Sequence, residues 1–240
     1  KNVTMIADWT FLTSVDPKNS NTANGTKQVG NNMAYYLNSA LTNICKDALV
    51  KSIIATKFSN IVLKIDVQNQ LPPPNYKLLV DETGTFFYWY NWSNVSSSPS
   101  GLADKLEDYF DAYVPKIIRD SNDQLKQKEQ EIASTLGKTI PYTADWSFTN
   151  SSEFLQLNRD DKKKHTQGIS NNTAYYLAQF FKKLAPDAIA KEAMVTLFDS
   201  VVFCIDVKNS LNDPIQPQNY SIVYNKETKT LVVTDRKSVV

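Results

Sequence analysis

Hydrophobic and polar residues alternate in a way that predicts a strand, a helix and three further strands. An apolar, β-branched run at Asn60–Val67 predicts a buried strand. Before it, residues 37–48 carry hydrophobic side chains at spacings of three and four, which predicts an amphipathic helix. Asn31 or Asn32 has the chemistry of the N-cap of that helix. A first strand at about Val3–Phe11 precedes the polar loop before the helix.

A hairpin is predicted after the buried strand. Its arms are Tyr76–Val80 and Thr85–Tyr90, and the Asp-Glu-Thr-Gly sequence between them suits a tight turn. The Pro-rich segment Pro72–Pro74 connects the hairpin to the buried strand. These elements together predict a β-α-β-β-β unit.

The same series returns in the second half of the chain, in the same order. The matched blocks are Ala7–Phe11 with Ala144–Phe148, Asn31–Leu37 with Asn171–Leu177, Asp47–Leu49 with Asp187–Ile189, Ile61–Val67 with Val201–Val207, and Glu82-Thr83 with Glu227-Thr228. Pro186 predicts that the helical stretch of the second copy is divided in two, with Pro186 opening the second helix. Ordered matches over this length indicate an internal duplication.

The segment between the two copies has a pattern of its own. Hydrophobic residues from Leu102 to Ile118 predict an amphipathic helix, which Pro115 should kink or divide and which Gly137 should terminate. The predicted organisation is a first repeat at 1–97, a helical connector at 98–137 and a second repeat at 138–240. The predicted fold class is α+β, with two antiparallel sheets that are each packed by helix and related by a pseudo-twofold axis.

A helix laid against an antiparallel sheet in β-α-β-β-β order resembles the element order of the cystatins. The Gln-x-Val-x-Gly motif that carries inhibitory activity in that family is missing from the loop after the second strand. Gln28-Val29-Gly30 lies before the helix and does not match the motif's spacing. The resemblance therefore concerns element order, and the activity is not carried over.

Composition and charge exclude several function classes. The 240 residues carry a net charge of +1, so there is no electrostatic case for binding nucleic acid. No apolar run approaches the ~20 residues of a membrane span. The first residue is Lys1 rather than Met, which fits a removed signal peptide or a trimmed chain. The sequence contains Asn-x-Ser/Thr triplets at Asn2, Asn24, Asn91, Asn94, Asn150, Asn171 and Asn219.

Those triplets, together with a first residue other than Met, favour a secreted or cell-surface protein, a class that includes lipoproteins. Cys45 and Cys204 are not equivalent in the repeat, and both lie among apolar residues, which favours two buried free thiols over a disulfide. With His165 as the single histidine and no Cys/His cluster, we expect no metal and no cofactor.

Repeated carboxylates are the candidates for catalysis. Asp8 and Asp145 recur in an Asp-Trp-Thr/Ser-Phe block. Two carboxylates that met between the repeats could share a proton and act as acid and base. The alternative is that each Asp bonds backbone at the edge of its strand. Asp66 and Asp206 recur within apolar strands, where a structural role is favoured, either as a partner of the Asn31/Asn171 region or as an acceptor for a backbone N–H.

The aromatic strand of the first hairpin is the candidate for binding. Phe86, Tyr88, Tyr90 and Trp92 share one face by alternation, whereas the second copy has smaller residues there. An exposed row of this kind could stack on a flat ligand or form an interface. The alternative is that the connector helix, with Tyr109, Phe110 and Tyr113, covers this face and explains why only one copy is aromatic.

The sequence therefore predicts a non-enzymatic exported or cell-surface binding protein. Its partner would be a small molecule, a glycan or a protein, held by the aromatic hairpin face or by a groove between the repeats. Two alternatives remain: a carboxylate-dependent hydrolase with its site between the repeats, and a structural component of a cell surface. No nucleophile elbow, phosphate-binding loop or dinucleotide fingerprint is present to name a reaction.

Overall fold

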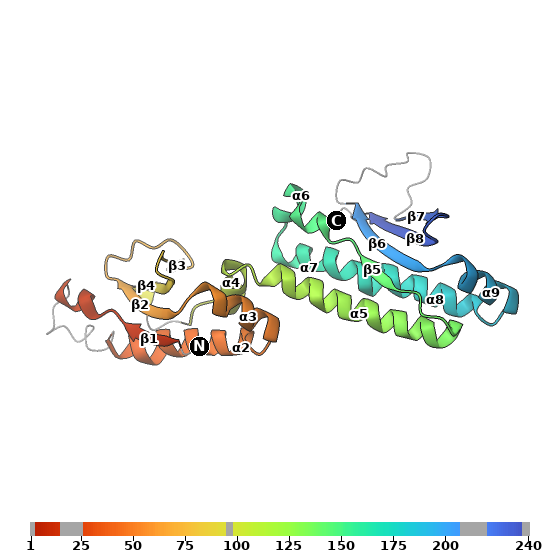
Figure 1. Ribbon diagram of the computed structural model, residues 1–240. Coiled ribbons are helices and arrows are strands. Elements are labelled where there is room, and N and C mark those ends of the chain that lie inside the picture. Colours follow the sequence, from red (N-terminus) through yellow and green to blue (C-terminus); the bar gives the residue numbers. More distant parts are fainter. Residues whose placement is uncertain (1–2, 15–25, 95–97, 207–219, 237–240) are drawn as a thin grey trace. The chain divides into compact units, whose positions relative to one another are not determined.

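Two compact units make up the protein. The computed structural model describes residues 3–14, 26–94, 98–206 and 220–236. Close contacts divide the chain into Lys1–Tyr113 and Val114–Val240. Each unit contains one four-stranded sheet with helices packed against it (Figure 1). The predicted tandem α+β duplication is confirmed.

Both units share a first strand, a pair of helices and three further strands in the same order, and each has additional helices. In the first unit the elements are β1 (Thr4–Ala7), α2 (Tyr35–Ile44), α3 (Ala48–Lys57), β2 (Asn60–Asp66), β3 (Tyr76–Val80), β4 (Thr85–Asn91) and α4 (Leu102–Tyr109). In the second unit they are α5 (Tyr113–Leu136, whose first residue belongs to the first unit), β5 (Tyr142–Ala144), α6 (Ser152–Leu155), α7 (Arg159–Gly168), α8 (Ala174–Leu184), α9 (Ala188–Leu197), β6 (Ser200–Asp206), β7 (Tyr220–Asn225) and β8 (Thr230–Arg236). The hairpin arms and the buried strands lie within a residue or two of their predicted positions.

Both sheets are mixed, so the predicted antiparallel sheets are wrong. The strand orders are β1-β2-β4-β3 and β5-β6-β8-β7. In the first unit, β1 and β2 are parallel, β2 and β4 are parallel, and only β3 and β4 are antiparallel. The second unit repeats this pattern. The resemblance to cystatins implies wholly antiparallel sheets, whereas here only the hairpin strands are antiparallel.

Two connections explain the mixed sheets. The helices between β1 and β2 carry the chain back along the sheet, so that both strands run in the same direction. The loop after β2 is long and contains Pro72–Pro74, and it places β3 one strand away from β2. The second arm of the hairpin, β4, then fills the space between them. The hydrophobic pattern identifies the strands but does not determine which arm of the hairpin pairs with β2.

The predicted asparagine N-caps are wrong. Asn31 and Asn32 lie inside a π-helical segment, Val29–Ala34, which continues directly into α2 without a side-chain cap. Asn171 and Asn172 lie in the equivalent π-helical segment, Ile169–Thr173, between α7 and α8. Because a π-helix widens the turn, each Asn-Asn pair marks a bulge within a longer helix rather than the start of a helix.

The true caps are two aspartates that recur in the repeat. Asp47 accepts hydrogen bonds from the backbone N–H groups of Leu49 (2.9 Å) and Val50 (3.2 Å) at the start of α3. Asp187 accepts one from the N–H of Ala190 (2.9 Å) at the start of α9. The helical stretch is therefore divided in both copies, and in the second copy Pro186 precedes the capping residue rather than opening the helix. These bonds satisfy N–H groups that a helix start leaves unpaired.

The predicted connector contains two helices that serve different units. α4 ends at Tyr109 and α5 begins at Tyr113, with Pro115 in its first turn, so the expected division near Pro115 is confirmed. α5 ends at Leu136, and Gly137 follows with a φ of 77°, the left-handed conformation expected of a terminating glycine. Leu102 and Leu106 of α4 are buried in the core of the first unit, and Leu125 and Ile132 of α5 are buried in the second.

α5 is fixed to the second unit by polar contacts as well as by its apolar face. The Ser121 hydroxyl donates to the carbonyl oxygen of Thr166 (3.0 Å). Glu131 forms an ion pair of 2.8 Å with Lys182 of α8, and the Lys128 and Lys182 hydrogen bonds lower the pKa of this carboxyl. α5 therefore covers one side of α8, and the opposite side of α8 faces a groove.

Candidate functional site

The aromatic row predicted to bind a ligand lies in the core of the first unit. Phe86 and Tyr88 are fully buried, and Tyr90 is 3% exposed. The ring of Phe86 lies 5.2 Å from that of Phe58 and 5.5 Å from that of Phe110, just after α4. These rings therefore cannot be reached by a ligand. For Phe86, the explanation that the helix after β4 covers the face is confirmed.

The remaining members of the row pack in other ways. The ring of Tyr76 on β3 packs against the rings of Tyr88 and Tyr90, at separations of 5.8 and 6.2 Å. Burial raises the pKa of the Tyr88 hydroxyl far above its usual range. Trp92 is not part of the strand, because β4 ends at Asn91 and a short 3₁₀ helix begins there. Its half-buried ring packs against Phe11 at 5.6 Å.

Asp8 organises the turn that follows β1. One of its carboxylate oxygens accepts hydrogen bonds from the backbone N–H (3.0 Å) and the hydroxyl (2.7 Å) of Thr10. The other oxygen lies 3.4 Å from the ammonium of Lys64. The Thr10 bonds, with a smaller contribution from Lys64, lower the pKa of this carboxyl. A carboxyl with a lowered pKa stays ionised at neutral pH and is poorly suited to act as a general acid.

The other repeated aspartates also bond backbone groups. Asp145 accepts a hydrogen bond of 2.9 Å from the N–H of Ser147, in the turn after β5. Asp66 accepts from the N–H groups of Gln68, Gln70 and Leu71, in the loop after β2, as the structural interpretation predicted. Asp8 and Asp145 belong to different units, and each shapes a turn of its own unit. A pairing of the two as acid and base stays a prediction.

A large groove in the second unit was not predicted from the sequence. Its volume is about 1540 Å³. Its floor consists of buried residues of α8, α9 and β8, which are Phe181, Met194, Leu231 and Val233. Its walls carry large apolar side chains with substantial exposure, which are Tyr176, Phe180, Leu197 and Ile222. The groove therefore presents an apolar surface within a single unit.

One end of the groove is polar. There α7 contributes Asp161 and Lys164, which form an ion pair of 3.3 Å, together with His165. The π-helical segment contributes Thr173, whose hydroxyl donates to the Asp235 carboxylate (2.8 Å). A polar rim on an apolar trough is typical of binding sites, since the apolar area gives affinity and the polar groups give orientation.

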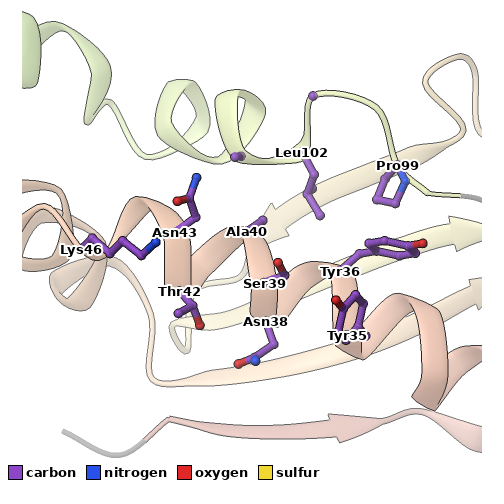
Figure 2. Close-up of a pocket in the computed structure, with 12 residues that line it drawn as sticks. Tyr35, Tyr36, Asn38, Ser39, Ala40, Thr42, Asn43, Lys46, Pro99 and Leu102 are labelled. Carbon is purple, nitrogen blue, oxygen red and sulfur yellow. The ribbon is translucent and has the colours of Figure 1, made fainter.

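The equivalent face of the first unit is covered by α4. Leu102 and Leu106 are buried against α2, and Phe110 packs on Phe58 and Phe86. In Figure 2, Leu102 points toward α2, and Asn43 at the end of α2 points toward α4. The hollow that remains between α2 and the start of α4 has a volume of about 600 Å³. α4 therefore occupies the place that is empty in the described part of the second unit.

Other kinds of site are not evident in the described ranges. Among residues 3–14, 26–94, 98–206 and 220–236, no three His, Cys, Asp or Glu side chains are grouped so that they could hold a metal ion. Cys45 and Cys204 are free, half-buried thiols that belong to different units. No helix in those ranges has both the length and the apolar character needed to cross a membrane.

Comparison of the chain with family models, with curated protein sequences and with solved structures finds no match. The signal that could have located the groove is a difference between the copies. Phe86, Tyr88 and Tyr90 correspond in sheet register to Leu231, Val233 and Asp235. The bulky rings that fill the first core are thus absent from the second, at the positions that line the groove.

Proposed function

We propose that this chain is a non-enzymatic binding protein and that the groove of the second unit holds its ligand or partner. The observation that carries the proposal is the exposure of large apolar side chains within one concave surface. Phe180 is 54% exposed and Tyr176 is 67% exposed, and both line the groove. Contiguous exposed apolar surface in a concavity marks an interaction site, because exposing it to water is unfavourable.

The chemistry of the groove supports binding rather than catalysis. None of the described residues that line it is a serine or a cysteine. The charged groups at its polar end already have partners within the unit, since Asp161 pairs with Lys164 and Asp235 accepts from Thr173. An activated nucleophile next to a base, which covalent catalysis requires, is not assembled by these residues.

We also propose that the protein is exported or displayed at a cell surface. The Asn-x-Ser/Thr triplets support this proposal, although one of them is unsuitable as a glycosylation site. Asn91 is 3% exposed, and its amide both donates to and accepts from the backbone of Leu71. The intact mass of protein secreted by a eukaryotic host tests the proposal. We expect added glycan mass that survives Asn91→Gln, and an unmodified mass would contradict it.

Binding of a hydrophobic fluorescent dye, such as anilinonaphthalene sulfonate, to the full chain tests the groove. Phe180→Asp places a carboxylate among the apolar walls and should weaken dye binding about tenfold or more. Ile189→Asp is the matched control, because Ile189 is an 81% exposed residue on α9 that does not line the groove. We expect this control to bind dye like the parent protein. Absence of dye binding, or equal effects of the two variants, would overturn the proposed function.

A further inference from the structure

We infer that the occupant of the groove is an amphipathic helix with the apolar stripe of α4, presented by a partner protein. The inference rests on the proposed binding function and specifies the class of partner. In the first unit this chain already shows how such a helix occupies the same place on the fold.

Positional equivalence follows from the repeat and from the sheet register. Phe110, just after α4, packs against Phe58 and Phe86. The corresponding residues in the second unit, Phe198 and Leu231, both line the groove. At the other end, Leu102 lies beside Tyr36 of α2, and the corresponding Tyr176 of α8 also lines the groove. The groove therefore extends from Tyr176 to Phe198 and Leu231, which are the equivalents of the residues that α4 and Phe110 contact in the first unit.

The edge of the sheet gives a further anchor in the first unit. The backbone N–H of Val80, on the edge strand β3, donates a hydrogen bond of 2.7 Å to the hydroxyl of Tyr109 on α4. The residue in register with Val80 is Tyr224 of β7. A helix with a tyrosine at the position of Tyr109 would reach this part of β7 in the same way.

The dimensions of the groove fit a helix better than a small molecule. Pockets for small ligands usually have volumes of about 300–1,000 Å³. The groove measures about 1540 Å³ and is an open trough rather than a closed cavity. The buried residues Leu102 and Leu106 of α4 and Phe110 just after it recur every four positions, which forms the apolar stripe that a groove-binding helix presents.

Side-chain differences between the units make the second groove more receptive. Where α2 has Ala40 beneath α4, α8 has Phe180, which is largely exposed. Where β4 has Tyr88 and Tyr90, β8 has Val233 and Asp235, which leave more space above the sheet. The second unit thus combines a deeper floor with a projecting aromatic ring, and that ring can pack into the surface of an incoming helix.

A fluorescein-labelled peptide with the sequence of residues 99–113 serves as the partner helix in the test. The full chain is titrated into the peptide, and binding is followed by fluorescence anisotropy. We expect saturable binding that Phe180→Asp weakens about tenfold or more and that the control Ile189→Asp leaves unchanged. A peptide carrying Leu106→Asp, which interrupts the apolar stripe, should bind at least tenfold more weakly than the parent peptide.

The outcomes separate the two proposals. Suppose that the parent protein binds the dye, that Phe180→Asp abolishes dye binding, and that the peptide does not bind. The groove is then a binding site, and the inference of a helical partner is overturned. If neither dye nor peptide binds, the proposed function is overturned as well. If light scattering shows a dimer that Phe180→Asp dissociates, the occupant is a second copy of this chain, and the inference of a separate partner is overturned.

A graft provides a test that does not depend on peptide affinity. A second copy of residues 92–113 fused after Arg236 reproduces the connection between β4 and α4, since Arg236 and Asn91 occupy equivalent register positions. The short tether gives a millimolar effective concentration, so even a weakly binding helix should fill the groove. We expect the grafted protein to lose dye and peptide binding. The same graft with Leu106→Asp in the added copy is the control, and unchanged binding by the first graft would contradict the inference.

Discussion

Replacing one phenylalanine in each unit by alanine compares a filled helix site with an open one. Phe110 is 1% exposed and packs on Phe58 and Phe86, whereas Phe180 is 54% exposed. Truncating a buried phenylalanine costs about 3–5 kcal/mol of unfolding free energy, because a cavity adds to the lost transfer free energy. Full burial of such a side chain contributes about 1.5–3 kcal/mol, so truncation of the half-exposed Phe180 should cost about 1 kcal/mol or less.

Hydrogen-exchange mass spectrometry at increasing urea concentrations monitors the unfolding of the two units separately in one experiment. Tryptophan fluorescence gives an independent signal, because Trp9, Trp89 and Trp92 lie in the first unit and Trp146 lies in the second. We expect Phe110→Ala to shift only the transition of the first unit and Phe180→Ala to shift that of the second slightly. An equally large loss for Phe180→Ala would mean that its ring is covered in the free protein, and this result would refute an open groove.

Three further predictions concern the structural polar groups. Asp47→Ala and Asp187→Ala should each destabilise their own unit by about 0.5–2 kcal/mol in urea unfolding, because each removes a helix cap. Lys138→Met should destabilise the second unit by about 1–3 kcal/mol, because the Lys138 ammonium donates to the carbonyls of residues 195 and 198 and to the Asp199 carboxylate. Lys138→Arg keeps the charge and should therefore lose less stability. Asp8 has a pKa below its ordinary value of 3.8, so its stabilising contribution should be present above that pH and be lost below it. The difference in stability between the parent protein and Asp8→Asn should therefore shrink as the pH falls from 7 to 3, and a constant difference would contradict this assignment.

The parts of the fold that depend on local chemistry could be predicted from the sequence. The strand at residues 60–66 and the hairpin arms follow from β-branched runs and from the turn residues between them. In the first hairpin, Asp81 accepts from the N–H groups of Thr83 and Thr85, as a turn aspartate commonly does. The end of α5 at Leu136 likewise follows from Gly137.

Features that depend on tertiary partners could not be predicted. Whether β2 pairs with β3 or β4 is decided by a loop, and the hydrophobic pattern of the strands is the same in either arrangement. Asn31 and Asn32 have the composition of a cap, but the helix continues through them as a π-bulge, because tertiary packing overrides local preference. The groove exists because no described element of the second unit covers the face that α4 covers in the first unit. A hydrophobic pattern shows that a face is apolar, but it does not show whether a helix covers that face.

The two helices between the repeats also show that the duplicated segment and the folding unit do not share a boundary. The sequence repeat resumes near residue 138, whereas the compact second unit starts at Val114 and includes α5. α4 lies beyond the matched blocks of the first repeat, yet its side chains complete the core of the first unit. For protein engineering, fragments should therefore be separated between Tyr113 and Val114. A first fragment that stopped before Leu102 would expose the same apolar face that the second unit leaves open.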